Sequence, residues 1–188
     1  VGGLTDTDEV LITISLLADV AVDTAHRHIE ATLLAQYGQP IGSDSNTPQS
    51  MIVVGMGKLG GYELNVSSDI DLIFLYPENG ETNGSRSLSN QEFFTRLGKR
   101  LIAAIAEPTG DGFVFRVDMR LRPYGDSGSL VMNFNAFENY LLTQGREWER
   151  YAWIKGRIIS GEDQGLSDIV RPFVYRKYLL YLILSFFW

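Results

Sequence analysis

Two short apolar runs separated by a glycine-rich turn constrain the fold of this chain most strongly. Residues 51–55 and 70–76 are too short for helices and rich in β-branched and aromatic side chains, so each is expected to be a buried strand. Between them, residues 58–68 are expected to form a turn region. Residues 112–122 alternate apolar and polar side chains and are expected to be a third strand.

Helical periodicity flanks these strands. Residues 7–37 repeat apolar side chains at three- and four-residue steps, and Asp6 supplies an N-terminal cap. Ser89, followed by Glu92, begins a second expected helix that runs to about residue 106. Beyond residue 133 the pattern is helical again. The sequence therefore favours an α+β fold, a small mixed sheet with helical flanks.

The expected organisation has three parts. Residues 38–50 are rich in Gly, Ser, Asn and Pro and are interpreted as a linker. This divides the chain into an N-terminal helical segment with the start of the linker (1–40), a core (51–132) and a C-terminal helical segment (133–188). The chain stops inside an apolar stretch, and residues 182–188 match no pattern, so a fragment of a longer protein is expected.

Composition excludes several classes of function. The formal charge is −7, and a negative surface repels phosphate backbones, so nucleic acid is not an expected partner. The chain has no cysteine, which excludes disulfides and thiolate metal sites and suits a reducing cytoplasm. The longest apolar run, 179–188, is far shorter than the ~20 residues that span a bilayer, so no membrane partner is expected.

The sharpest local pattern is the pair Asp69 and Asp71 at the start of the second strand. Residues two apart in a strand share a face, with Cα atoms roughly 6.6 Å apart. Two ionised carboxylates at that distance repel each other unless one takes up a proton or a cation lies between them. Mg²⁺ prefers such oxygen ligands. Solvated aspartates at a strand start are the alternative.

A third carboxylate, Asp118, lies on the polar face of the alternating segment. If that segment pairs beside the second strand, Asp118 completes a metal-binding triad with Asp69 and Asp71. Arginines on the same polar face can then bind phosphate oxygens, although a solvated charged face is the usual meaning of such alternation. These arginines are Arg116, Arg120 and Arg122.

Several other side chains carry weaker signals. The glycines of residues 55–61 either allow backbone N–H groups to approach a phosphate or form a tight turn. His26 and His28 lie too far apart around the first helix to share a metal and are expected at the surface. Trp148 and Tyr151 have helical spacing and are expected in the core.

Longer motifs resemble a known family. Gly-Met-Gly-Lys-Leu-Gly-Gly-Tyr-Glu-Leu-Asn-Val-Ser-Ser-Asp-Ile-Asp-Leu-Ile-Phe (55–74) resembles the signature of the bacterial glutamine synthetase adenylyltransferase/adenylyl-removing enzymes. So do Val-Asp-Met-Arg-Leu-Arg-Pro (117–123) and Gly-Arg-Glu-Trp-Glu-Arg-Tyr-Ala (145–152), and the resemblance covers about residues 51–178. The family belongs to the DNA polymerase β-like nucleotidyltransferases, which implies a nucleotidyltransferase catalytic core at 51–132.

The resemblance implies roles for individual residues. Asp69 and Asp71 match the metal pair of the superfamily and Asp118 its third carboxylate, so all three are expected to be catalytic. They are expected to bind two Mg²⁺ ions, with Mn²⁺ as the alternative metal. Nucleotide (ADP or ATP) and inorganic phosphate are the expected small substrates. The residues expected to hold them are Gly60, Gly61, Lys58, Ser68, Arg120 and Arg122.

The resemblance also implies a reaction. Family members carry two such domains: one removes AMP from a tyrosine of glutamine synthetase by phosphorolysis, giving ADP, and the other attaches AMP from ATP. The motifs at 117–128 and 145–152 are more similar to the removing half. AMP removal is therefore expected, in the cytoplasm, in the regulation of nitrogen assimilation. Glutamine synthetase is the expected protein substrate, and a PII-type signalling protein is expected to act through the full-length enzyme.

Three alternatives remain open. The chain could carry the ATP-dependent transferase activity instead. It could be a nucleotidyltransferase that modifies a small antibiotic. It could also be a catalytically silent regulatory domain that binds nucleotide.

Overall fold

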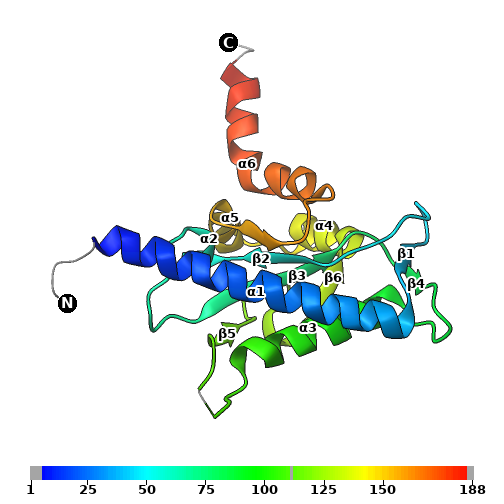
Figure 1. The fold of residues 1–188 in the computed structure, drawn as a ribbon. Coiled ribbons are helices and arrows are strands. Elements are labelled where there is room, and N and C mark those ends of the chain that lie inside the picture. Colours follow the sequence, from blue (N-terminus) through cyan, green and yellow to red (C-terminus); the bar gives the residue numbers. More distant parts are fainter. Residues whose placement is uncertain (1–5, 111, 186–188) are drawn as a thin grey trace.

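The computed structural model describes residues 6–110 and 112–185, with side chains through Tyr175, and combines helices with short strands (Figure 1). The α+β expectation is confirmed, whereas the side chains of the apolar run 179–188 lie outside the described part. The helices are α1 (Thr7–Tyr37), α2 (Gly57–Gly60), α3 (Asn90–Ala106), α4 (Phe134–Thr143), α5 (Glu147–Ile154) and α6 (Leu166–Ser185), with the 3-10 turn η1 (Gly125–Ser127). The strands are β1 (Pro40–Gly42), β2 (Ile52–Gly55), β3 (Ile70–Tyr76), β4 (Gly80–Thr82), β5 (Val117–Asp118), β6 (Val131–Asn133) and β7 (Arg157–Ser160).

The main sheet is mixed and is organised around β3. Its strand order is β5–β3–β2–β7, and β6 also pairs with β3. Strand β2 runs antiparallel to β3 and β7, whereas β5 and β6 run parallel to β3. A separate antiparallel pair joins β1 to β4. Because neighbours lie on both sides of β3, its backbone is held along its whole length.

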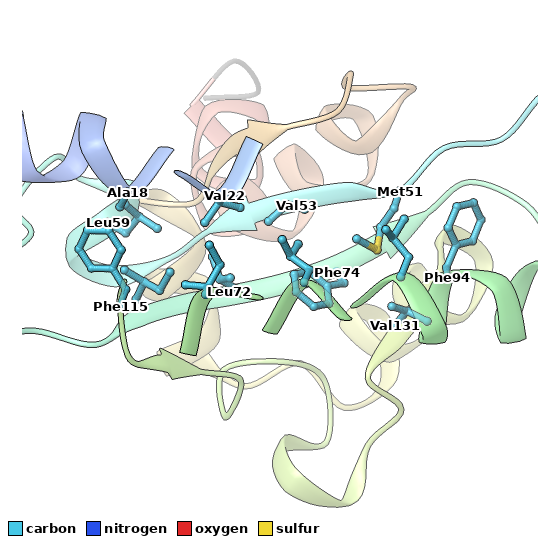
Figure 2. Packing of buried hydrophobic residues seen from close by; sticks show 14 of the residues in the cluster. Ala18, Val22, Met51, Val53, Leu59, Leu72, Phe74, Phe94, Phe115 and Val131 are labelled. Atoms are coloured by element: carbon cyan, nitrogen blue, oxygen red, sulfur yellow. The ribbon is translucent and has the colours of Figure 1, made fainter. Parts of the chain in front are cut away.

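Helices cover both faces of this sheet. Leu72 and Phe74 of β3 pack in a cluster with α1 and α3 (Figure 2). Ile73 and Leu75 belong to a second cluster on the opposite face, formed with α4, α5 and α6. Alternate residues of a strand point to opposite faces, so burial on both sides explains why β3 is apolar without interruption.

The two helices on the first face begin where the sequence predicts. Asp6 accepts a 2.6 Å hydrogen bond from the backbone N–H of Thr7 at the start of α1. Ser89 and Glu92 make both hydrogen bonds of a capping box at the start of α3. No helix in the described ranges is both long and apolar enough to cross a bilayer.

Two segments differ from their expected organisation. Residues 38–50 contain β1 and therefore are not an irregular linker, and α1 packs in the same cluster as the sheet. The segment 133–188, expected to be helical, supplies β7, the neighbour of β2. The short strand β7 forms because it pairs with β2, about a hundred residues earlier in the chain. Local periodicity does not predict such long-range pairing. The three-part division of the chain stays a prediction.

The long strand expected at 112–122 is wrong. Only Val117 and Asp118 are in a strand, and Phe113 is 52% exposed although the alternation places it inside. The carbonyl oxygen of Ile105 accepts hydrogen bonds from two successive N–H groups, at residues 114 and 115, so the chain turns there instead of extending. After Asp118, a further turn forms as the N–H of residue 122 donates to the carbonyl of residue 119.

The surface position expected for His26 is also wrong. His26 is 2% exposed, and its Nδ1 lies 2.7 Å from Oγ of Ser160 in β7. That hydroxyl donates in turn to Asp23. His28 is exposed, as expected. A polar cluster thus joins α1 to the edge of the sheet.

Candidate active site

The turn between β2 and β3 is shaped around Asp71. Gly57 has φ +55°, and a Cβ built on it would lie 2.9 Å from Oδ2 of Asp71. The N–H of Met56 donates to the backbone carbonyl of Asp71 at 2.9 Å. Glycine at position 57 therefore meets two needs, a left-handed backbone and a close carboxylate.

The next glycines contact protein backbone. A Cβ on Gly60 would lie 2.0 Å from the carbonyl oxygen of Lys155, whereas a Cβ on Gly61 would lie 3.3 Å from the Lys155 side chain. Arg157 donates hydrogen bonds to the carbonyls of Gly60 and Leu59. Close packing against the start of β7 explains Gly60 without a ligand. Phosphate binding by Gly60 and Gly61 stays a prediction.

The parallel pairing of β3 and β5 places two carboxylates together. Asp71 lies directly opposite Asp118 in the register, so the two acids come from neighbouring strands, as the sequence predicts. Burial first, and then the negative charges of Asp118 and Asp69, raise the pKa of Asp71 to about 6. A hydrogen bond from Arg120 lowers the pKa of Asp118. The two neighbouring carboxyl groups therefore differ in pKa, with that of Asp71 raised and that of Asp118 lowered.

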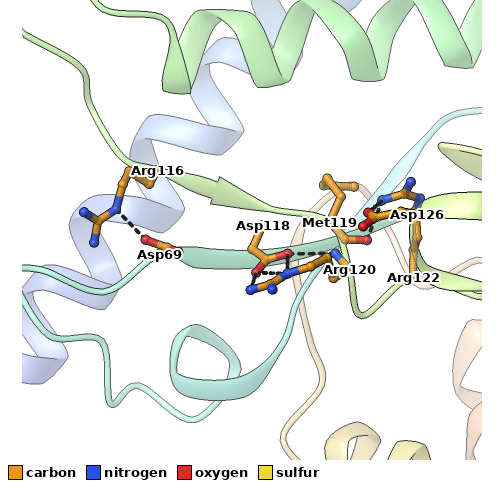
Figure 3. Close-up of polar contacts among 7 residues, drawn as sticks. All are labelled: Asp69, Arg116, Asp118, Met119, Arg120, Arg122 and Asp126. Atoms are coloured by element: carbon orange, nitrogen blue, oxygen red, sulfur yellow. Dashed lines mark hydrogen bonds and ion pairs between the residues drawn. The ribbon is translucent and has the colours of Figure 1, made fainter.

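Asp69 is arranged differently from the expected strand pair. Strand β3 begins at Ile70, so Asp69 precedes it and the shared-face rule does not apply. Its Oδ1 accepts a 2.5 Å hydrogen bond from Nε of Arg116, which also donates to the carbonyl of Ser67 (Figure 3). Both side chains of this ion pair are about half exposed.

Two of the three carboxylates, Asp69 and Asp118, therefore form ion pairs with arginines. Asp118 accepts from Arg120 with an ion-pair distance of 2.5 Å, and Figure 3 shows the two ion pairs at opposite ends of β5. In the described ranges, no three acidic or imidazole side chains are grouped closely enough to hold a metal ion. The structure brings Asp71 and Asp118 together, while Asp69 is near enough to act on the pKa of Asp71.

The remaining predicted residues lie around this pair. Lys58 donates a 3.2 Å hydrogen bond to Oγ of Ser68, which joins the glycine turn to the residues before β3. Lys58 and Arg120 both oppose the rise in the pKa of Asp71, so their positive charges act on its carboxyl group. Arg122 donates from Nη1 to the carbonyl of Met119 and lies 3.6 Å from Oδ1 of Asp126, and its positive charge helps to lower the pKa of Asp118.

Sequence reasoning missed a group of side chains next to Arg120. Arg120 and Arg122 line a cavity of about 370 Å³ together with Tyr140, Arg146 and Glu149. Glu149 is only 5% exposed. In the sequence, residues 145–152 are singled out only by the family resemblance. Their helical spacing alone predicts that Trp148 and Tyr151 face the interior, and it does not identify Glu149.

The core positions expected in α5 are wrong. Trp148 is 48% and Tyr151 is 66% exposed, whereas Trp153 is buried. Helical spacing shows that residues share one side of a helix, but it does not show which side is buried. The buried residues Glu149 and Trp153 lie on the other side of α5, which faces the protein.

Sequence comparison identifies the family. Residues 1–168 match the family model described as "GlnE: Glutamate-ammonia ligase adenylyltransferase". Similar proteins, each named a bifunctional glutamine synthetase adenylyltransferase/adenylyl-removing enzyme, include one from Chromobacterium violaceum, 68% identical over 174 residues. Others come from Neisseria meningitidis serogroup A, 59% identical over 178 residues, and Pseudomonas putida, 59% identical over 170 residues.

The aligned regions cover 93%, 95% and 88% of this chain but 19%, 20% and 17% of the respective relatives. The chain thus spans about one fifth of the length of the curated relatives that it matches. The match to the family model extends over most of the chain and includes the glycine turn, strands β3 and β5, and helix α5. The chain therefore belongs to the glutamate-ammonia ligase adenylyltransferase family.

Proposed function

We propose that this chain removes AMP from adenylylated glutamine synthetase by phosphorolysis. Inorganic phosphate attacks the α-phosphorus of the AMP–tyrosine linkage, and the products are ADP and unmodified tyrosine. The observation that supports the proposal most directly is the side-by-side placement of Asp71 and Asp118 on parallel strands. The relatives are named for both an adenylyltransferase and an adenylyl-removing activity, so the direction is our own inference.

The carboxylates suit a divalent cation. Asp71 has a raised pKa because its charge is partly buried near two other acids, and a cation would relieve that repulsion. Asp71 and Asp118 would hold Mg²⁺, or Mn²⁺ as the alternative, and Asp69, which pairs with Arg116 in this structure, would be the third carboxylate ligand. When bound, two such ions neutralise charge on the attacking and leaving oxygens.

The chain's own positive side chains would position the reacting groups. Arg120 and Lys58 both act electrostatically on Asp71, so a phosphoryl group bound there would lie within their field. Phosphate is already anionic and needs no strong general base. The work of the protein is therefore orientation and charge compensation on a strand that is buried on both faces.

The proposed setting follows from the family. The motifs at 117–128 and 145–152 support the removing half rather than the transferring half. We infer a cytoplasmic role in the regulation of nitrogen assimilation. Glutamine synthetase is the protein substrate, and a PII-type signalling protein acts through the longer enzyme.

The test is a comparison of three proteins on glutamine synthetase that carries AMP-tyrosine. With phosphate and Mg²⁺, the wild-type chain should release ADP, and Asp118→Asn should reduce the rate at least about a hundredfold, because a ligand and a positioned charge are lost. Asp8→Asn, an exposed acid at the start of α1, is the control and should retain activity. Full activity of Asp118→Asn would refute the assignment.

The same assay separates the alternatives. Incorporation of label from α-labelled ATP into unmodified glutamine synthetase would identify the transferase direction instead. Nucleotide binding with no turnover in either direction would identify a silent regulatory domain.

A further inference from the structure

The cavity next to Arg120 has an unusual charge for this chain. Its volume is about 370 Å³, within the range of small-ligand sites. It lies between the turn that follows β5, the end of α4 and the start of α5. Three guanidinium groups line it, from Arg120, Arg122 and Arg146, although the whole chain has a formal charge of −7.

The three arginines are placed differently. Arg120 contacts Asp118 at 2.5 Å, so this guanidinium belongs both to the carboxylate site and to the cavity wall. Arg122 is only 13% exposed as a side chain and forms a 3.6 Å ion pair with the exposed Asp126, while its buried Nε has no hydrogen-bond partner among the described residues. Arg146 is exposed and pairs with no carboxylate in the part of the chain that the structure describes.

One carboxylate also lines the cavity, and its oxygens are already engaged. Glu149 accepts a 2.5 Å hydrogen bond from the hydroxyl of Tyr140 and a 2.9 Å hydrogen bond from the backbone N–H of Arg146. Burial and the hydrogen bond to Glu149 raise the pKa of Tyr140 to about 12, so Tyr140 stays a donor at neutral pH. The backbone at residue 146 is thereby anchored, and the positive groups of the cavity outnumber the negative one.

We propose that this cavity is the binding site for the inorganic phosphate that attacks AMP-tyrosine, and that Arg146 with Arg122 selects phosphate over water. The proposal rests on the function proposed above. Guanidinium groups match the geometry of phosphate oxygens and gain far less from neutral water. Arg120 connects the two sites, so an anion in the cavity lies next to the carboxylate pair.

The reaction balances with this placement. An oxygen of the bound phosphate forms a new bond to the α-phosphorus, while the bond from that phosphorus to the tyrosine oxygen breaks. The electron pair leaves with the phenolate, which takes up a proton from water. The phosphate from the cavity becomes the β-phosphoryl group of ADP, whereas attack by water would give AMP.

The test uses Arg146→Gln, which removes one charge at an exposed position. The KM for phosphate should rise about tenfold or more, while the KM for adenylylated glutamine synthetase and the melting temperature stay unchanged. The ratio of AMP to ADP among the products should rise. Arg146→Lys should recover part of the loss, and Arg86→Gln, an exposed arginine of the loop before α3, should behave as wild type.

A second measurement separates this proposal from the proposed function. Inorganic phosphate alone is titrated into the wild type and Arg146→Gln and followed by phosphorus NMR. Weaker phosphate binding in the variant supports the site even if no AMP is released by any protein. Unchanged phosphate binding or an unchanged KM for phosphate overturns it while leaving AMP removal intact. A raised KM for the protein substrate alone also overturns it and assigns the cavity to the target protein.

Discussion

The charge of Asp71 is expected to destabilise the fold that positions it. Its pKa is raised from 3.8 to about 6, because burial disfavours the charged form and because Asp118 and Asp69 are negative. A carboxyl group whose pKa is higher in the folded state contributes stability at low pH, and this contribution is lost as the pH rises through about 6. Asp71→Asn removes the charge at nearly constant size, so it should stabilise the metal-free chain at pH 7.5.

The pKa sets the size of this effect. A rise from 3.8 to about 6 corresponds to about 3 kcal/mol once the group is fully ionised. Asp71 is partly exposed, and solvent screens the repulsion, so a gain of about 1–2 kcal/mol is expected. The gain should shrink as the pH falls towards 3.8, where the wild-type carboxyl group is increasingly protonated in both states.

Urea unfolding in EDTA at several pH values measures the effect. Asp69→Asn is the matched control: its carboxylate is 44% exposed and paired with Arg116, so its loss should cost up to about 1 kcal/mol. It relieves only the smaller of the two charge repulsions on Asp71, so any net gain should stay below that of Asp71→Asn. If Asp71→Asn is no more stable than wild type at pH 7.5, or its gain does not depend on pH, the burial of an unfavourable charge at this site is refuted. Added Mg²⁺ should stabilise the wild type more than Asp71→Asn.

Two further predictions concern stability. Gly60→Ala should destabilise the chain by about 3 kcal/mol, because its Cβ would lie 2.0 Å from the carbonyl oxygen of Lys155. A Cβ on Gly61 would meet only the ends of two flexible side chains, Lys155 and Glu63, at 3.3 Å or more, so Gly61→Ala should cost less than about 1 kcal/mol, and equal losses in thermal unfolding would contradict the packing argument. Burial lowers the pKa of His26 from 6.5 to about 4, so the free energy of unfolding should fall by up to about 3 kcal/mol as the pH drops from 6.5 through 4. Urea titrations should show that His26→Gln loses this pH dependence, whereas the control His28→Gln, at an exposed position, keeps it. If the free energy of unfolding changes with pH equally in both variants, the assignment of this dependence to His26 is contradicted.

Local sequence was sufficient where neighbours in the chain make the interactions. The cap of α1 by Asp6 and the capping box of α3 connect residues at most three positions apart, and both were predicted. The strands β2 and β3 were predicted because a short apolar run bounded by turn residues has few other solutions.

Local sequence failed where distant segments decide. Only two residues of the alternating segment 112–122 form a strand. Hydrogen bonds to the carbonyl of Ile105 turn the chain before this strand, and a turn at Met119 follows it. Trp148 was expected inside and is exposed, because the orientation of α5 depends on which side meets the sheet.

The sequence by itself determined the mixture of helices and strands, the family and the identities of the three acids. Only the tertiary structure decided that Asp71 faces Asp118, that Asp69 instead contacts Arg116, and that arginines from two separate segments line one cavity. The physical reason is that a side chain's type is encoded at its own position. Its charge state and partners depend on strand register and on burial by segments far away in the chain.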